Sequence, residues 1–569
     1  GLTLSGAATL SGNPTFTING NGSATGTLTM SGGFNTGGAT RTLTFNSGTG
    51  TSAASISGAF AGTAGILDLA GTTPTVTVGA LTTTANAVRV SGTGTYTFSG
   101  ASTFTGGVIL NNASATVIAT VDAGFGATSG KVKFNVASTG FTLRSDSAIT
   151  LTAGLDTSSY GGTITIDRVT SGAGITHTMS LASTFGGKTV IVTPGTNITS
   201  NSAYGLTLSG AATLSGTNTF TVNNNGSGTG TLTIGTGIIS STGSITKDGA
   251  GTLVLSGNNS FDGGVIIKSG IVSGTTSANA FGTGTITIGD SSGSANATLS
   301  SDLGGTFANP ISVASTNTGV ATITANGSFT TSIFSGAVTL NSHGLTLSTT
   351  YYGYLTLSGG ITGTGNLVLN ATAYAITLDT TSVNSTGTIT NSGAGSATNI
   401  ISGGVGSNVT GIIQNSTTSA LTISTTAITV NAAGTTLTNS SGTTVLTVSG
   451  GVTGTGNLVL NNNSATAAGI TLTTTSVNNT GTITCSGTNA GTGTVTITGG
   501  VGANVTGIIQ NSTTSALTIS TTAITVNAAG TTLTNSSGTT VLTVSGGVTG
   551  TGNLVLNNNS ATAAGITLS

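Results

Sequence analysis

Apolar and polar residues alternate with a period of two along almost the whole chain. Leu, Ile, Val or Phe occupies one position and Thr or Ser the next, in short runs such as Thr15–Ile18, Thr42–Phe45, Thr285–Ile288 and Leu421–Ser424. This alternation predicts β-strands with one buried and one solvent-facing side. Clusters of Gly, Asn and Ser, which tolerate positive φ in turns, separate the runs roughly every 8 to 12 residues.

Long segments of the sequence occur twice. A stretch that begins GLTLSGAATLSG at Gly1 returns at Gly205, and a longer one that begins GIIQNSTTSALTIS at Gly411 returns at Gly507, 96 residues later. Similarity at a fixed period indicates a repeat architecture in which neighbouring units share one core. We expect each long period to contain four or five coils of about 20 to 25 residues.

Sandwiches and barrels also use short alternating strands. Near-identical copies would then form separate domains, yet no Pro-rich linker divides them, and the chain has only four Pro. Stacked copies place like residues above one another, which suits Asn, Thr and aliphatic ladders. We therefore predict an all-β fold, a parallel β-helix or β-solenoid. We expect one continuous solenoid with segments 1–204, 205–379 and 380–569, of which the first carries most of the charges and the last carries none.

Charged residues are almost absent, at 3% of 569 residues, and segment 380–569 contains no Asp, Glu, Lys or Arg. Like charges stacked about 4.8 Å apart would repel, so a charge-free repeat suits a parallel stack. The hydrophobic content of 36% argues against disorder. The net charge of −1 argues against electrostatic binding of nucleic acid or of an acidic membrane surface.

The segment Lys247–Gly289 reads KDGAGTLVLSGNNSFDGGVIIKSGIVSGTTSANAFGTGTITIG, and a weaker copy covers Thr95–Leu110. It resembles the autotransporter-associated β-strand repeat of bacterial surface proteins, whose passenger regions contain it. The matching parts are GAGTLVLSG, NNSFDGG and NAFGTGTITIG. The resemblance implies a right-handed β-helix on a bacterial cell surface, with Gly263 and Gly264 at a corner and Phe261 packed beneath it.

Few residues could support catalysis or bind a metal. The side chains that could line a carbohydrate-cleaving groove lie between residues 131 and 188: Asp146, Asp156, Asp167, Arg144, Arg168 and His177. They share no motif, so we interpret them as turn charges and predict a non-enzymatic protein. His177 and His343 lack a metal-binding context, and the counterpart of Cys485 in the preceding copy is Asn391. We therefore predict no catalytic residue, no metal site and no cofactor.

Two further features narrow the function. Arrays of Thr-x-Thr on a β-helix can bind ice, but the irregular spacing of these strings along the sequence argues against a flat lattice. No apolar run approaches the roughly 18 residues of a transmembrane helix. Neither end resembles a polar cap, so we interpret the sequence as part of a longer protein whose export signal and anchor lie elsewhere.

Together these patterns predict an extracellular structural protein of a bacterial surface: a self-associating β-solenoid of a fibre, sheath or surface layer. Association through neutral faces, lateral or end to end, is the expected partnership. One alternative is an adhesin passenger stalk that binds a host, surface or carbohydrate ligand, although no aromatic or charged binding insertion is evident. A carbohydrate-active β-helix enzyme is the other alternative.

Overall fold

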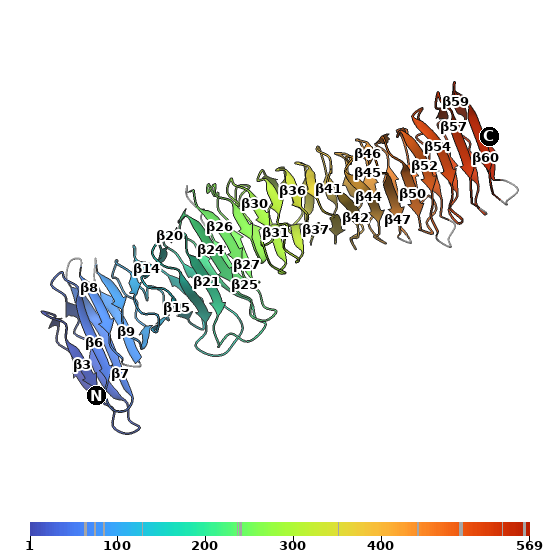
Figure 1. Cartoon of the computed structure of the whole chain (residues 1–569). Helices are drawn as coiled ribbons and strands as arrows, with labels where there is room; N and C mark the ends of the chain where they lie inside the picture. Colours follow the sequence, from blue (N-terminus) through green and yellow to red (C-terminus); the bar gives the residue numbers. More distant parts are fainter. Residues whose placement is uncertain are drawn as a thin grey trace. The chain divides into compact units, whose positions relative to one another are not determined.

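The computed structural model describes the chain except for residues 62–64, 73–74, 83–85, 128, 236, 238–241, 351, 441–442, 489–492, 538 and 561–564. The described residues form 61 strands and no helix, and the pairings between named strands are parallel. No helix among them could span a membrane. The chain divides into two compact units, unit 1 (Gly1–Gly284) and unit 2 (Thr285–Ser569). In both, strands of successive coils lie side by side (Figure 1), which confirms the predicted parallel β-solenoid.

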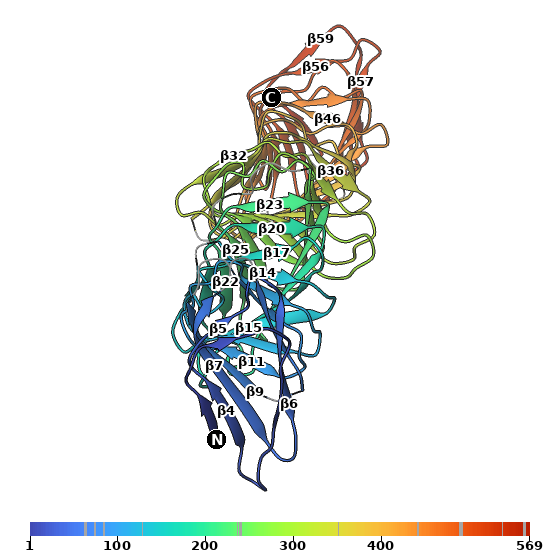
Figure 2. The same cartoon turned by 90° about the vertical axis from the view of Figure 1, so that its left-hand side faces the viewer.

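Unit 1 contains three sheets. Sheet 1A holds β1 (Leu2–Leu4), β4 (Gly26–Met30), β7 (Ser52–Ala61), β9 (Thr75–Thr82), β11 (Thr95–Phe98), β13 (Thr116–Ala119), β15 (Thr139–Arg144), β18 (Gly162–Asp167), β21 (Thr189–Pro194), β24 (Thr217–Val222), β26 (Ser244–Asp248) and β28 (Val265–Ile267). Sheet 1B holds β3 (Thr15–Ile18), β6 (Arg41–Ser47), β8 (Ile66–Ala70), β10 (Ala87–Val90), β12 (Val108–Leu110), β14 (Lys131–Phe134), β17 (Gly154–Thr157), β20 (Ser183–Gly186) and β23 (Ala212–Ser215). Sheet 1C holds β16 (Thr150–Leu151), β19 (Thr176–Met179), β22 (Tyr204–Leu208), β25 (Gly230–Ile234), β27 (Thr252–Leu255) and β29 (Gly270–Gly274). The short strands β2 (Ala8–Thr9) and β5 (Phe34–Asn35) pair with each other. Figure 2 shows β14, β17, β20 and β23 stacked side by side.

Unit 2 repeats the same plan with three stacks. Sheet 2A holds β30 (Ile286–Ile288), β33 (Ile311–Val313), β36 (Val338–Asn341), β39 (Ile361–Thr364), β46 (Ile428–Val430), β49 (Val452–Gly454), β56 (Ile524–Val526) and β59 (Val548–Gly550), with single bridges between some of them. Sheet 2B holds β31 (Ala297–Ser301), β34 (Ala321–Ala325), β37 (Leu345–Thr349), β40 (Leu367–Ala371), β42 (Gly387–Asn391), β44 (Val409–Gln414), β47 (Thr435–Asn439), β50 (Leu458–Asn462), β52 (Gly481–Cys485), β54 (Val505–Gln510), β57 (Thr531–Asn535) and β60 (Leu554–Asn558). Sheet 2C holds β32 (Gly305–Phe307), β35 (Thr331–Phe334), β38 (Tyr354–Leu357), β41 (Ile376–Leu378), β43 (Asn399–Ile401), β45 (Leu421–Ile423), β48 (Leu446–Val448), β51 (Ile470–Leu472), β53 (Val495–Ile497), β55 (Leu517–Ile519), β58 (Leu542–Val544) and β61 (Ile566–Leu568).

The coil length in unit 2 agrees with the sequence periods. Leu421 pairs with Leu446, Leu446 with Ile470, Ile470 with Val495, and Val495 with Leu517. Four coils of 22 to 25 residues therefore make up the 96-residue repeat. The division of the chain into segments 1–204, 205–379 and 380–569 stays a prediction, as does the right-handed winding.

The core is built from the apolar members of each alternating run. In the three-residue strands of sheet 2C from β41 to β58 the two outer residues are buried and the middle residue is half-exposed, as in Leu446, Thr447 and Val448. Because consecutive side chains of a strand point to opposite faces, this is the burial that the period of two predicts. Aliphatic ladders of this kind supply most of the buried apolar area.

Polar side chains also enter the core of unit 2. They form a ladder of amides from the last residues of four neighbouring strands of sheet 2B. Asn391, Gln414, Asn439 and Asn462 occupy consecutive coils in register and are fully buried. The Asn391 amide donates to Gln414 Oε1 at 2.7 Å and to the Ser419 carbonyl at 2.8 Å. Buried amides are tolerated only when hydrogen-bonded, so this ladder fixes the register of the turns beside it.

The two copies of the long repeat differ at this ladder. Cys485 replaces Asn391 and Val495 replaces Asn399, whose amide donates to Asn391 Oδ1 at 2.8 Å in the first copy. Cys485 stacks on Gln510 in the second copy, where Gln510 Oε1 accepts no hydrogen bond from the described residues. Burial raises the pKa of the Cys485 thiol to about 12, so it stays protonated. The second copy is therefore less completely hydrogen-bonded than the first.

Restoring both amides in the second copy should stabilise unit 2. We expect Cys485→Asn with Val495→Asn to add about 1 to 3 kcal/mol, because the new Asn at 485 would donate to Gln510 Oε1 and accept from the new Asn at 495. Each single change should give less, since it leaves one buried amide atom unpaired. Urea denaturation followed by circular dichroism measures the effect. A double variant no more stable than the sum of the two single variants would contradict the coupling.

Candidate functional site

Two pairs of oppositely charged residues between 131 and 188 occupy facing positions on neighbouring coils. Arg144 lies opposite Asp167 in the strand register, and Lys133 lies opposite Asp156. The same rule holds outside this region, where Arg89 lies opposite Asp68 and donates to its carboxylate at 2.8 Å. Opposite charges on facing positions attract, whereas like charges there would repel. The arrangement explains these side chains as partners within the stack.

Asp167 and His177 are buried and held by neighbouring atoms. Arg144 Nε donates to Asp167 Oδ2 at 2.8 Å, and the amide of Asn197 donates to Asp167 Oδ1 at 3.0 Å. His177 Nδ1 accepts from the Ile149 amide at 3.3 Å, so the ring proton lies on Nε2, which donates to the Asp167 carbonyl at 3.4 Å. Burial lowers the pKa of His177 and keeps the ring neutral near pH 7.

Asp146 and Asp156 bind turns rather than each other. Asp146 accepts from the Thr170 amide at 3.0 Å and hydroxyl at 2.8 Å, and lies 3.4 Å from Arg168; these contacts lower its pKa. Asp156 accepts from the Ser158 amide and hydroxyl, at 3.0 and 2.6 Å. Asp146 and Asp167 lie at the same end of sheet 1A, each beside an arginine of the neighbouring coil, whereas Asp156 belongs to sheet 1B. The three candidate carboxylates are therefore not brought to one face.

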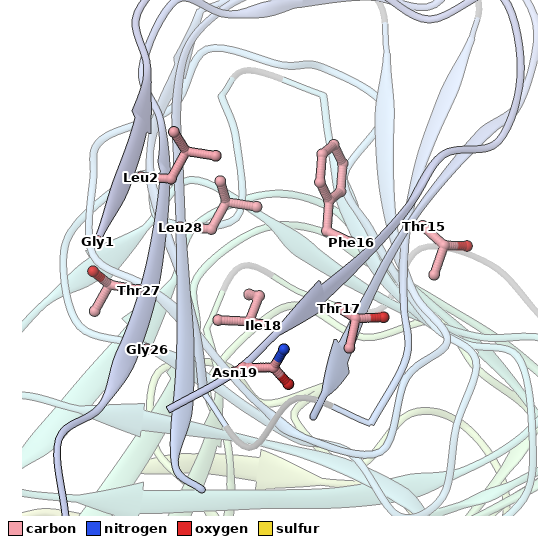
Figure 3. A pocket seen from close by; sticks show the side chains of 10 residues that line it. All are labelled: Gly1, Leu2, Thr15, Phe16, Thr17, Ile18, Asn19, Gly26, Thr27 and Leu28. Carbon is pink, nitrogen blue, oxygen red and sulfur yellow. The ribbon is translucent and has the colours of Figure 1, made fainter. Parts of the chain in front are cut away.

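Other possible sites offer little chemistry. Within the described part of the chain, no three His, Cys, Asp or Glu side chains form a metal-binding group. The Nδ1 atom of His343 lies 2.7 Å from the carbonyl of Gly344, and Cys485 is buried. A cavity of about 460 Å³ at the first coil is lined by core-facing side chains such as Phe16, Ile18 and Leu28 (Figure 3). Its other lining residues are Gly, Leu, Thr and Asn, and no ionisable side chain lines it.

Two segments of unit 1 share one coil design. In the first, Val88 pairs with Val108, and in the second Ile245 pairs with Val265, each 20 residues further on. A fully buried Phe, Phe104 or Phe261, lies under the corner between those strands. The corner residue is Gly107 or Gly264, with φ of +72° and +80°, which side chains rarely adopt. A Cβ atom at Gly107 would also lie 2.1 Å from the Lys131 carbonyl oxygen.

Comparison with protein families assigns these coils. Residues 88–113 and 245–273 match the family model of the passenger-associated-transport-repeat. This chain carries autotransporter-type passenger repeats. The match confirms the resemblance of GAGTLVLSG and NNSFDGG and of the weaker copy, while NAFGTGTITIG (279–289) lies outside it. No curated protein matched the chain in a further comparison, and no solved structure did.

The second passenger repeat contains a buried lysine. Lys247 is fully buried, and its Nζ donates to the carbonyls of Asp248 (2.8 Å), Gly249 (2.7 Å) and Ser269 (3.1 Å). Burial lowers the pKa of Lys247 to about 7, although the nearby Asp248 charge opposes the shift. The corresponding residue of the first passenger repeat is the buried Val90, so the coil does not require a lysine.

Sheet 2C presents two ranks of hydroxyls to solvent, which we call the hydroxyl face. The inner rank takes the middle residue of each strand from β38 to β61: Thr356, Thr377, Ile400, Thr422, Thr447, Thr471, Thr496, Thr518, Thr543 and Thr567. The outer rank lies two residues on: Ser358, Asp379, Ser402, Ser424, Ser449, Thr473, Thr498, Ser520, Ser545 and Ser569. The Thr strings are unevenly spaced in the sequence, yet these threonines align in register because turns of unequal length absorb the irregularity.

A group of rings, the aromatic cluster, lies on three successive coils of unit 2: the exposed Phe329, Tyr352 and Tyr354 and the half-buried Tyr374. Phe329 and Tyr352 stack with ring centroids 4.4 Å apart, and Tyr374 lies 4.8 Å from Tyr354. We did not single out these residues from the sequence, since they form no insertion. Their signal was local, because four of the seven Tyr of the chain lie between residues 351 and 374.

The Lys247 site should make the second passenger repeat sensitive to pH. Between pH 7 and 10.5 the unfolded chain binds a proton that the folded coil does not bind, so stability should rise with pH in that window by at most about 1.4 kcal/mol per unit. Below pH 7 the cost of burying the charge is present in full.

Hydrogen exchange with mass spectrometry, corrected for intrinsic rates, tests this on the whole chain. Protection of β26–β29 should increase from pH 7 to pH 9, and Lys247→Met should abolish the increase. Repeat peptides from segment 380–569, which has no Asp, Glu, Lys, Arg or His, serve as the internal control. An equal slope in the variant would rule out Lys247 as the source.

Proposed function

We propose that this chain is a non-enzymatic structural protein of a bacterial cell surface, which builds a fibre, sheath or surface layer by lateral association of its solenoids. The passenger repeats support an exported, surface location, because that family is associated with transported passenger regions. The observation that carries the proposal is the hydroxyl face of sheet 2C, and the occupant we propose for it is a second copy of the chain.

The hydroxyl face suits self-association for electrostatic reasons. Asp379 is the one charged residue in its two ranks, and unit 2 contains no Lys or Arg. Two neutral faces approach without repulsion, and Thr and Ser hydroxyls both donate and accept hydrogen bonds, so the face is complementary to itself.

The size of the face bounds the strength of the contact. Ten strands at about 4.8 Å and a width of about 15 Å give roughly 700 Å² per partner, or about 1,400 Å² in total. This lies near the lower limit of specific protein interfaces. A single contact should therefore be weak, and assembly should strengthen with the number of repeats that meet.

The alternative function is that of an adhesin stalk. The observation that favours it is the aromatic cluster, an exposed apolar surface on an otherwise hydroxyl-rich unit. The aromatic cluster borders the hydroxyl face, because Tyr354 and Thr356 lie on the same side of β38, but its rings are not part of the two ranks. The third possibility, a carbohydrate-active enzyme, has the weakest support because its candidate carboxylates bind separate turns.

Charges placed on the hydroxyl face should abolish lateral association. We expect the native protein to form ordered fibres or sheets at both low and high salt, since no ion pairs on this face can be screened. Thr447→Lys with Thr496→Lys places two like charges on alternate coils of sheet 2C and should leave separate solenoids at low salt. Electron microscopy and sedimentation velocity measure the outcome.

A matched variant controls for the charge itself. Thr436→Lys with Thr484→Lys puts the same two charges on alternate coils of sheet 2B, in one rank of half-exposed outward positions, and should assemble normally. Loss of assembly in both variants, or in neither, would argue against the hydroxyl face. If the protein never assembles but changes the shape of growing ice crystals, the hydroxyl face binds ordered water and not a second copy of the chain.

A further inference from the structure

We propose that the aromatic cluster of unit 2 is a binding site for a neutral saccharide chain. The site would give a surface solenoid a carbohydrate ligand through residues that lateral association does not use.

Phe329 occupies a backbone conformation that is unfavourable for its side chain. Its φ is +54°, in the left-handed region, and its side chain is 68% exposed. The other non-Gly residues with positive φ in the described chain are Ala, Ser, Asn or Thr. A bulky ring in this region costs free energy, and this one recovers little by burial. Strain of this kind is concentrated at functional sites, where the side chain is needed for another reason.

The rings are held on a hydrogen-bonded scaffold. The Phe329 amide donates to the Tyr352 carbonyl at 3.1 Å, which fixes the two turns one coil apart. The Tyr354 amide donates to the Thr330 carbonyl at 2.9 Å, and Thr349 Oγ1 donates to the Tyr374 carbonyl at 2.8 Å. The cluster therefore extends about 10 Å across three coils, at about 4.8 Å per step. Its order does not depend on a ligand.

The ring geometry favours a flat ligand. Phe329 and Tyr352 stack with an interplanar angle of 13°, and Phe329 is the more exposed of the two rings. Tyr374 meets Tyr352 and Tyr354 at angles near 60°, which turns it against the edge of the stack. This is a platform with an upright wall, not a cage around a cation. The apolar C–H face of a pyranose ring can lie on such a platform.

Polar side chains accompany the rings at each turn. Asn326 precedes Phe329, Thr350 precedes Tyr352, and Thr372 precedes Tyr374. Asn326 and Thr372 are exposed, and Thr350 Oγ1 donates to Asn326 Oδ1 at 2.5 Å. Alternating rings and uncharged donors or acceptors match a ligand whose units each carry an apolar face and hydroxyl edges. A polysaccharide has this repeating chemistry.

The charge of unit 2 argues against other stacking ligands. It has three Asp, no Glu, and no Lys or Arg, so nothing on it can neutralise phosphate or uronate groups. Nucleic acids and acidic polysaccharides are therefore disfavoured, and a neutral glycan is favoured.

The test is a titration of the full chain with cellohexaose, chitohexaose and maltohexaose. The chain has no Trp, and three of its seven tyrosines belong to the cluster, so tyrosine emission reports on the site alongside calorimetry. We expect at least one of the three to bind, and Phe329→Gly or Tyr374→Ala to weaken it by at least about tenfold. Tyr160→Ala, which removes an exposed tyrosine of unit 1, should leave the affinity unchanged.

The choice of Phe329→Gly separates binding from folding. Gly accepts the positive φ, so this variant should unfold at the same temperature as the parent or higher. Titrations in the Thr447→Lys, Thr496→Lys background give the same answer whether or not the chain associates laterally. No binding of any neutral hexasaccharide, equal binding by Phe329→Gly, or binding of tetramethylammonium alone would overturn the proposal.

Discussion

Parallel stacking in register is the constraint on which the structure depends. Each outward or inward residue faces a counterpart about 4.8 Å away in the next coil. A residue type can therefore be repeated only if two side chains of that type pack or bond at this distance without repulsion. Aliphatic side chains, Thr hydroxyls and amides meet that condition, and charges do not. Unit 1 shows how charge is accommodated, since Arg89 faces Asp68 and Arg144 faces Asp167. Unit 2 avoids the problem and keeps only three Asp.

The same constraint explains what the sequence could predict. The period of two identifies the strands, and the 96-residue repeat resolves into four coils whose length lies in the expected range. The buried Phe261 and the positive φ of Gly264 agree with the corner inferred from the family resemblance. These features depend on local alternation and on turn residues, which are visible in one sequence.

Features that depend on the length of each turn could not be predicted. The stretch at Gly1 and its copy at Gly205 begin with equivalent strands, yet β1 lies in sheet 1A and β22 in sheet 1C. The hydroxyl face arises because turns of unequal length bring Thr471 and Thr496 into register, although the strings are unevenly spaced in sequence. The aromatic cluster has the same origin, since residues 22 or 23 apart become neighbours only when the coil closes. Sequence spacing alone does not give those neighbours.

The charged residues that sequence reasoning ranked highest and the rings that it missed differ in how the fold uses them. Asp167 and Arg144 satisfy each other, and His177 is buried as a neutral ring between two backbone groups. Each has a structural explanation that is complete without a ligand. Phe329 has none, because its ring is exposed and its backbone would be more stable with Gly. Most coils of this fold repeat the same low-energy backbone and packing arrangement. A residue that departs from this arrangement without a structural reason is therefore the stronger indication of function. The aromatic cluster, and not the set of reactive side chains in unit 1, is therefore the better candidate for a ligand site.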